Sequence, residues 1–227
     1  MIKLENVVLA SPEQMNFVIE GMRYPMNSWG KSDSHDCKQN SSFCMECECN
    51  KIGYRLGEND ISLMQRLSNA GTEHRKYMRM MPVYVRITAP LYWWKEFDTY
   101  KVGTVANSCS TMHKIAEKGF TLGDFSIEHL NDDRSAELSN VEWLEHLIHH
   151  LNRDRLRFIE TKDKQYWWQM IQLLPSSYNQ TRNVMLNYEV LANIYRQRKN
   201  HKLDEWREVC KWIESLPYSE LITGEEE

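Results

Sequence analysis

The run from Val83 to Ala89 constrains the fold more than any other part of the chain. Apolar and polar residues alternate along it, and Pro90 follows directly. Successive side chains of a β-strand point to opposite faces, so this alternation predicts a strand with one buried face. Proline has no N–H to donate and closes the run. We therefore expect a half-buried strand, followed by the short, aromatic and amphipathic segment Leu91 to Phe97.

A polar segment comes next, and it is rich in hydroxyl and amide groups around Gly103. Its hydrogen-bonding side chains are Thr99, Tyr100, Lys101, Thr104, Asn107, Ser108, Ser110 and Thr111. Lys101 adds a positive charge suited to a phosphate or a carboxylate. The pattern favours a ligand-binding segment. The alternative is a polar connection whose side chains cap the next helix.

Length and charge limit the class of protein. With 227 residues, 41% hydrophobic content and eight tryptophans, the chain can bury a sizeable core, and we expect one domain over residues 1–227. The net charge of -4 predicts neither a nucleic acid nor an anionic membrane as partner. Neither a membrane-spanning apolar run nor a signal peptide is visible, which predicts a cytoplasmic protein.

Capping patterns predict two helices clearly. Ser11 followed by Pro12 and Gln14, and Ser139 followed by Glu142, are capping boxes ahead of apolar residues at helical spacing. Residues 2–9 are typical of an edge strand, residues 115–118 of a helix that Gly119 ends, and residues 166–174 and 204–213 of further helices.

A third helix is predicted from Asp60 to Gly71. Asp60 is expected to cap its start and Gly71 to end it. The basic run from His74 to Arg79 follows. It is either a solvated surface or a ligand site placed just before the central strand.

A cysteine-rich insertion is expected at about residues 31–58. It holds four of the six cysteines, namely Cys37, Cys44, Cys47 and Cys49. Cys44 and Cys47 have the spacing of one metal knuckle, but a second knuckle is missing. Three alternatives stay open: ordinary thiols without a metal, a structural zinc, and a zinc-dependent contact surface.

The pattern of residues 181–195 predicts a helix. Basic residues follow at its end, namely Arg196, Arg198, Lys199, His201 and Lys202. Basic residues there stabilise the helix dipole. Asn187 and Arg198 are eleven residues apart, close to three turns, so their side chains face the same way. An amide and a guanidinium on one face suit a base edge and a phosphate.

Four short pieces, which together cover most of the chain, resemble the flavin-dependent thymidylate synthases. Gly21 to Tyr24 resembles the family's first helix end, and Leu67 to His74 resembles its Gly-His-Glu-Ser segment. Ile87 to Pro90 resembles the strand before the signature. Leu174 and Pro175, with Asn187 and Arg198, resemble the C-terminal region.

The signature itself departs from the family pattern. Thr99, Tyr100 and Lys101 stand in place of Arg-His-Arg, and Thr104 stands in place of Ser. Further departures are Thr72 for His, Met112 for Arg, His113 for Tyr and Glu189 for Arg. A hydroxyl cannot replace the planar fork of a guanidinium, so these changes should weaken flavin and folate positioning most.

The resemblance implies an α+β fold with a mixed β-sheet flanked by helices, in a cytoplasmic homotetramer. It implies a role in nucleotide biosynthesis, namely methylation of dUMP with FAD, NADPH and methylenetetrahydrofolate. The cofactor-binding residues would be Tyr100, Lys101, Thr104, Asn107, Glu73 and His74. The substrate-binding residues would be Ser110, Asn187 and Arg198. Catalytic residues are not identified.

Two functions follow from this resemblance. The first is a divergent methyltransferase in which Lys101, Tyr100 and Trp94 rebuild the flavin site. The second is a non-catalytic homologue that binds or sequesters a pyrimidine nucleotide and has a degenerate flavin motif. A yellow or a colourless purified protein would distinguish them.

Overall fold

The computed structural model describes residues 2–37, 53–133 and 137–224. Its strands are β1 Lys3–Leu9, β2 His35–Asp36, β3 Tyr54–Arg55, β4 Pro82–Pro90, β5 Val105–Ser108 and β6 Asn179–Asn187. Its α-helices are α1 Pro12–Arg23, α2 Glu58–Asn69, α3 Lys76–Arg79, α4 Leu91–Phe97, α5 Thr111–Lys114, α6 Asn140–Thr161, α7 Lys164–Leu173, α8 Tyr188–Arg198, α9 Asp204–Glu214 and α10 Glu220–Thr223. Short 3-10 turns are η1 Tyr24–Met26, η2 Trp29–Lys31 and η4 Leu122–Asp124.

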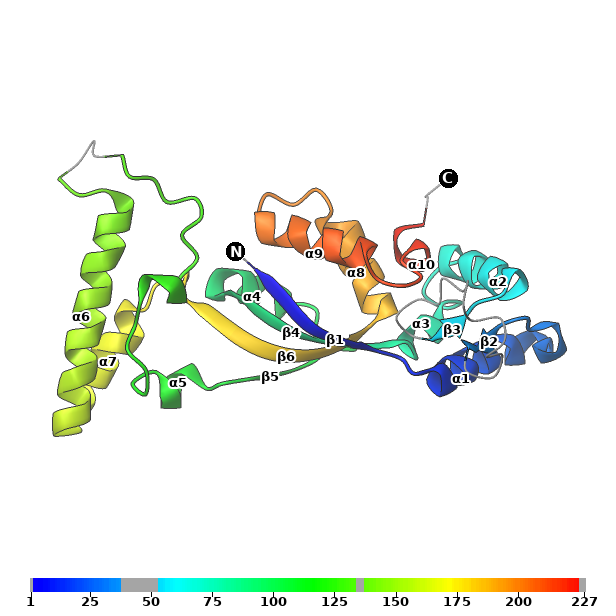
Figure 1. Cartoon of the computed structure of the whole chain (residues 1–227), viewed down its shortest axis with the longest axis horizontal. Coiled ribbons are helices and arrows are strands. Elements are labelled where there is room, and N and C mark those ends of the chain that lie inside the picture. The colour runs from blue at the N-terminus through cyan, green and yellow to red at the C-terminus, as the bar shows by residue number, and fades with distance from the viewer. Residues whose placement is uncertain (1, 38–52, 134–136, 225–227) are drawn as a thin grey trace. The chain divides into compact units, whose positions relative to one another are not determined.

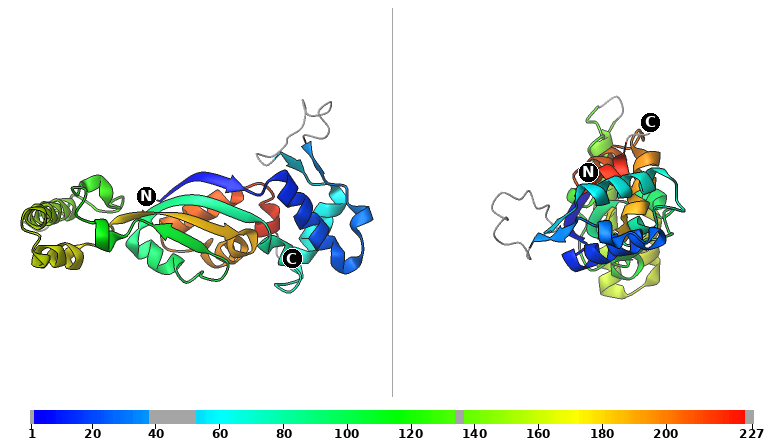
Figure 2. Two further views of the ribbon diagram at one scale, coloured as in Figure 1. Left: turned by 90° about the horizontal axis from the view of Figure 1, so that it is seen from below. Right: turned by 90° about the vertical axis from the view of Figure 1, so that its right-hand side faces the viewer.

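The predicted α+β fold, a sheet flanked by helices, is confirmed. Four strands form one sheet in the order β1-β4-β6-β5, and neighbouring strands run in opposite directions (Figure 1). Figure 2 shows these four strands side by side. The alternating run from Val83 to Ala89 is β4, an inner strand, and the predicted edge strand is β1. The short strands β2 and β3 pair separately as an antiparallel ribbon.

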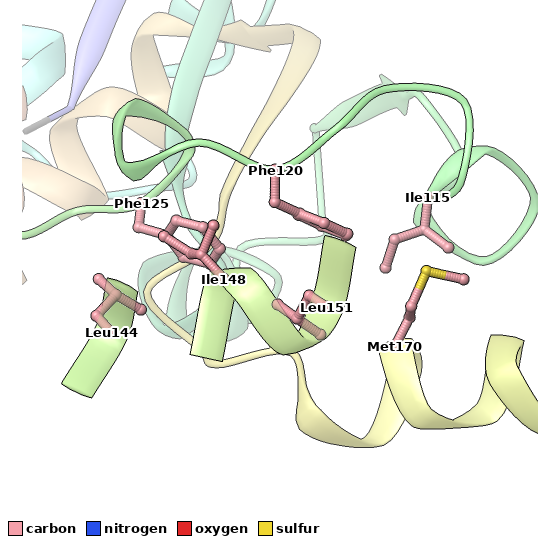
Figure 3. Packing of buried hydrophobic residues seen from close by; sticks show 7 residues of the cluster. All are labelled: Ile115, Phe120, Phe125, Leu144, Ile148, Leu151 and Met170. Carbon is pink, nitrogen blue, oxygen red and sulfur yellow. The ribbon is translucent and has the colours of Figure 1, made fainter. Parts of the chain in front are cut away.

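Contacts divide the chain into two compact units. Unit 1 consists of Met1–Lys3, Ile87–Thr99 and Asn107–Asn183. Its apolar core joins α6 and α7 to the segment before them, and is formed by Ile115, Phe120, Phe125, Leu144, Ile148, Leu151 and Met170 (Figure 3). The amphipathic pattern of the two helices explains this packing, because one face of each is buried.

Unit 2 consists of Leu4–Arg86, Tyr100–Ala106 and Val184–Glu227. Helix α8 lies at its centre and packs against α3, α9 and α10, while α1 also packs against α3. Leu191 and Ile194 of α8 and Trp206 of α9 are fully buried. The centre of unit 2 is therefore a helix whose start and end carry two of the three residues predicted to bind substrate, Asn187 and Arg198.

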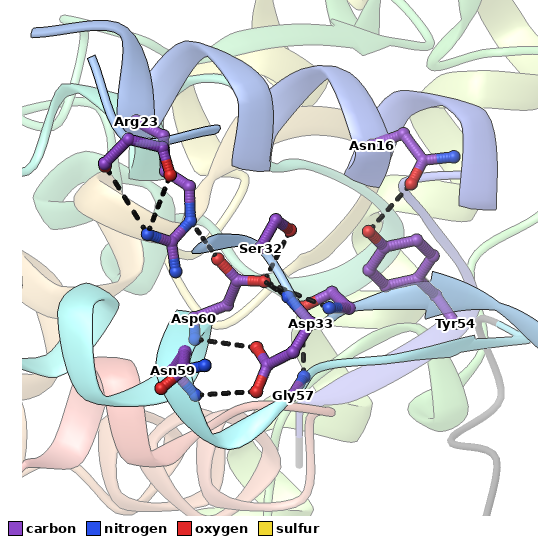
Figure 4. A network of polar contacts seen from close by, with 10 residues as sticks. Asn16, Arg23, Ser32, Asp33, Tyr54, Gly57, Asn59 and Asp60 are labelled. Atoms are coloured by element: carbon purple, nitrogen blue, oxygen red, sulfur yellow. Dashed lines mark hydrogen bonds and ion pairs between the residues drawn. The ribbon is translucent and has the colours of Figure 1, made fainter. Parts of the chain in front are cut away.

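A buried carboxylate joins α1 and α2 within unit 2. Asp60 accepts hydrogen bonds from Arg23 Nε at 2.5 Å and from the hydroxyls of Ser32 at 2.8 Å and Ser34 at 2.6 Å (Figure 4). The backbone N–H groups of Asp33 and Ser34 also donate to Asp60, both at 3.1 Å. Burial opposes ionisation, but these hydrogen bonds outweigh it and lower the pKa of Asp60.

The prediction that Asp60 caps α2 is therefore wrong. Gly57 is the N-cap, and the helix begins at Glu58. The carboxylate of Asp33 accepts the backbone N–H groups of Asn59 and Asp60 instead, at 2.9 and 3.2 Å. Asp60 lies inside the first turn of α2, where its carboxylate pairs with Arg23.

Two other predictions of local structure are wrong. Residues 181–187 belong to β6 and not to a helix, because the segment pairs with β4 and β5. Residues 115–117 follow a helix that has already ended at Lys114. The capping boxes at Ser11 and Ser139 are confirmed, and Gly71 follows α2 with a φ of 105°.

Within the three described ranges, no helix combines the length and apolar character needed to cross a membrane.

Candidate binding site on helix α8

The hydroxyl-rich segment folds into a tight loop against the start of α8. The Thr104 hydroxyl donates to the carbonyl of Tyr100 and closes the turn. Gly103 has a φ of 80°, which residues with a Cβ rarely adopt. A Cβ at this position would lie 3.1 Å from both Asn187 Nδ2 and Val190 Cγ2. Glycine is therefore needed both for the turn and for its close approach to α8.

Tyr100, in this loop, contacts Arg198 at the end of α8. Arg198 Nε donates to the Tyr100 hydroxyl at 2.9 Å, and that hydroxyl donates to Gln197 Oε1 at 2.8 Å. The guanidinium carbon lies 4.8 Å from the centre of the Trp206 ring and 5.7 Å from that of Tyr100. These contacts hold the plane of the guanidinium in one orientation.

The structure thus brings together two predicted site residues that are 98 positions apart. Lys101 follows Tyr100 directly and is exposed. A planar guanidinium held on two aromatic rings, with a solvent-exposed ammonium on the neighbouring loop residue, suits a phosphate group.

Asn187 has a structural task at the other end of α8. It is the N-cap, and its Oδ1 accepts the N–H of Val190 at 3.0 Å. Its Nδ2 is the atom that faces Gly103. Asn187 therefore links the loop to the helix that carries Arg198.

Asn107 and Ser110 belong to unit 1, on β5 and at the start of α5. Both are exposed, and the Ser110 hydroxyl accepts the N–H of His113 at 3.4 Å as the N-cap of α5. The capping alternative considered for this polar segment thus holds at Ser110.

Glu73 and His74 are exposed in the connection between α2 and α3. Beyond them, Arg79 of α3 makes a bidentate ion pair with Glu189 of α8 through Nε and Nη2. The hydrogen bonds that Arg79 donates to Glu189 raise the pKa of Arg79. Glu189, which stands where the resembled family has arginine, is thus buried against a cation from another helix.

Sequence reasoning missed a polar cluster around Arg182 in unit 1. Arg182 donates to Gln180 Oε1 at 2.9 Å and to Asp98 Oδ1 at 2.7 Å, and its guanidinium lies 4.1 Å from the Trp94 ring centre. Gln180 Nε2 donates to the Thr111 hydroxyl at 3.1 Å. Trp94 is buried and donates to the Gln180 carbonyl. The side chains of Gln180 and Arg182 are two positions apart, so they lie on one face of a strand but not of a helix. The predicted helix therefore gave no reason to pair them.

No group of three or more His, Cys, Asp or Glu side chains in the described part of the chain could hold a metal. Cys37 is buried next to the β2–β3 ribbon. Cys44, Cys47 and Cys49 lie outside the described residues, so the zinc hypothesis stays a prediction.

Comparison with solved structures shows which fold this is. The chain is similar to the flavin-dependent thymidylate synthase ThyX from Helicobacter pylori complexed with FAD and dUMP, with 15% sequence identity, a TM-score of 0.61 and coverage of 97% of this chain and 95% of that one. It is also similar to the UMP/dUMP methylase PolB from Streptomyces cacaoi bound with 5-Br dUMP, with 12% identity, a TM-score of 0.58 and coverage of 98% and 95%. No protein-family model and no curated protein matches the sequence. The chain therefore has a ThyX-like fold.

Proposed function

We propose that this protein binds a pyrimidine nucleotide, dUMP, through the cations of unit 2. One observation carries the proposal: Arg198 contacts both Tyr100 and Trp206, and the exposed Lys101 directly follows Tyr100 in the chain. Similar structures have been solved with dUMP, 5-Br dUMP and 5-Br UMP bound, which supports a nucleotide of this class.

Arg198 and Lys101 are proposed to bind the phosphate. A guanidinium binds two phosphate oxygens at once, whereas an ammonium acts as a point charge, so Arg198 should orient the phosphate and Lys101 should add attraction. Asn187 Nδ2 is proposed to donate to the nucleotide, since its Oδ1 caps α8. Ser110 lies in unit 1, and its part in substrate binding stays a prediction from the resemblance.

The hydroxyl groups at two of the signature positions are engaged within the chain, which argues against flavin binding there. The Tyr100 hydroxyl is bonded to Arg198 and Gln197, and the Thr104 hydroxyl is bonded within the loop. Glu189 places a carboxylate where the family has a guanidinium. Nucleotide binding without methylation is therefore the function that the geometry supports best.

Flavin-dependent methylation of dUMP is the second candidate. The exposure of Lys101, and the FAD in the similar Helicobacter pylori structure, favour it. It would need FAD, NADPH and methylenetetrahydrofolate, with Glu73 and His74 as further cofactor contacts. A visible spectrum of the purified protein after addition and removal of excess FAD tests this candidate. Absence of flavin absorption would exclude it.

The resemblance to the family further leads us to propose a homotetramer. Light scattering coupled to size exclusion would test this, and a monomeric mass would reject it.

Calorimetric titration with dUMP tests the main proposal, with Arg198→Ala as the decisive variant. Loss of a hydrogen-bonded charge costs about 1.5–3 kcal/mol, so Kd should rise roughly 10- to 150-fold. Arg66→Ala is the matched control, because Arg66 is an exposed helical arginine of the same unit and its removal changes the net charge equally. An unchanged Kd in Arg198→Ala would remove that residue from the site. Absence of dUMP binding by the wild type would reject the function.

A further inference from the structure

Three histidines lie on the outer face of α6 in unit 1, namely His146, His149 and His150. The other face of the helix carries Leu144, Ile148 and Leu151, which are buried in the core of the unit (Figure 3). This apolar packing fixes how α6 is rotated about its axis. All three imidazoles are therefore exposed on one side of a well-packed helix.

The spacing of the histidines suits chelation of a metal ion. His146 and His150 are four residues apart, so their side chains lie one turn apart on the same face, with Cβ atoms about 5–6 Å apart. Two imidazoles at this spacing on a helix hold a single metal ion. His149 is three residues from His146, and its ring centre lies 6.3 Å from that of His150. His146 is thus common to both pairs at helical spacing.

The three imidazoles are not engaged by other polar groups. None of them makes a hydrogen bond or an ion pair with another residue in the described ranges. Arg153, three residues after His150, is paired with Asp154 at 3.1 Å, which offsets its positive charge. The capping box of Ser139 and Glu142 holds the start of α6. The helix therefore presents available nitrogen ligands on a fixed backbone.

We propose that His146 and His150 chelate one divalent metal ion of the late first transition row, the class that includes Ni²⁺, Cu²⁺ and Zn²⁺. Imidazole nitrogen suits these ions, whereas Mg²⁺ and Ca²⁺ prefer oxygen ligands. No third His, Cys, Asp or Glu side chain within residues 2–37, 53–133 and 137–224 completes a metal-binding group with them. Water would fill the other coordination positions, so the site is open and exchangeable.

This metal site is independent of the proposed nucleotide site. Helix α6 belongs to unit 1, whereas Arg198 and Lys101 belong to unit 2. The two binding activities can therefore be measured separately on the same protein.

Calorimetric titration of the full, EDTA-treated chain with Ni²⁺ tests the proposal. Nickel is the probe because imidazole suits it, while thiolates favour zinc. Loss of a supporting outer-shell group already lowers metal affinity about 10- to 100-fold, so loss of a ligand in His146→Gln or His150→Gln should raise the Kd at least about tenfold. His113→Gln is the matched control, because it removes an exposed imidazole from α5 of the same unit. Its Kd for Ni²⁺ should equal that of the wild type.

His149→Gln decides which pair binds. An unchanged Kd in this variant supports chelation by His146 and His150. A raised Kd in His149→Gln together with an unchanged Kd in His150→Gln would overturn the assignment of His150. Absence of Ni²⁺ binding, or equal Kd values in the wild type and His146→Gln, would overturn the proposal and leave the three histidines as a solvated helix face.

The double variant His146→Gln with His150→Gln separates chelation from a general effect on the helix. Because one imidazole alone does not chelate, the second substitution should raise the Kd little beyond the first. Ni²⁺ should raise the melting temperature of the wild type and leave that of the double variant unchanged, since a ligand stabilises only the state that binds it. An equal shift in both proteins would count against the site. Wild type that binds Ni²⁺ but not dUMP would support this site and reject the proposed nucleotide function.

Discussion

Replacing Tyr100 by Phe tests whether the candidate site depends on the orientation of Arg198. The change removes the hydroxyl that accepts from Arg198 at 2.9 Å and donates to Gln197 at 2.8 Å. It keeps the ring, whose centre lies 5.9 Å from that of Trp206. Packing and cation–π contact are therefore preserved, and only hydrogen bonding is lost.

The expected effect follows from these two bonds. A hydrogen bond to a charged group contributes about 1.5–3 kcal/mol and a neutral one about 0.5–1.5 kcal/mol. Tyr100 is only half-buried, so water should replace part of this loss. We expect the free energy of dUMP binding to weaken by about 1–2 kcal/mol, which raises Kd roughly 5- to 30-fold.

Isothermal titration calorimetry would give the Kd values, and urea unfolding would give the stability of each variant. Tyr166→Phe is the matched control. The guanidinium of Arg157 lies 5.5 Å from the centre of the Tyr166 ring, so this variant also removes the hydroxyl of a tyrosine that contacts an arginine. Its Kd for dUMP should equal that of the wild type.

A double-mutant cycle decides whether Tyr100 acts through Arg198. If it does, Tyr100→Phe should change the Kd little once Arg198 is already Ala, so the two effects are strongly non-additive. Fully additive effects, or an unchanged Kd in Tyr100→Phe, would refute the reasoning.

Three further predictions concern the stability of the two units. Asp60→Ala should lower the free energy of unfolding in urea by about 3–5 kcal/mol at neutral pH, since it strands a buried arginine. The lowered pKa of Asp60 means that its contribution is complete above the unfolded pKa of about 3.9 and is lost as pH falls through the folded pKa, so acid should destabilise the wild type more than this variant. Gly103→Ala should cost at least about 1–2 kcal/mol, because φ is 80° and the new Cβ would crowd Asn187 and Val190; equal urea midpoints would contradict this. Leu151→Ala, at a fully buried position of the unit 1 core, should lower the free energy of unfolding in urea by about 2–5 kcal/mol. A smaller decrease would show that neighbouring side chains fill the cavity.

The errors in local prediction share one physical cause, which is competition from distant residues. Residues 181–187 contain apolar positions in phase with α8, and this phase predicted a helix. In the folded chain the same residues pair with β4, and hydrogen bonding between strands far apart in sequence overrides a weak local preference. Asp60 is a good capping residue locally, but Arg23, 37 positions away, draws its carboxylate into the interior.

The sequence by itself determined the features that depend on near neighbours. Capping boxes at Ser11 and Ser139, the alternation along β4 and the glycine after α2 need only residues within a few positions, so their physics is readable in the chain. Only the tertiary structure decided which charges meet. Tyr100 reaches Arg198, and Arg79 reaches Glu189 across 110 positions, because packing of the loop and of α3 against α8 sets these distances, and no local pattern records that packing.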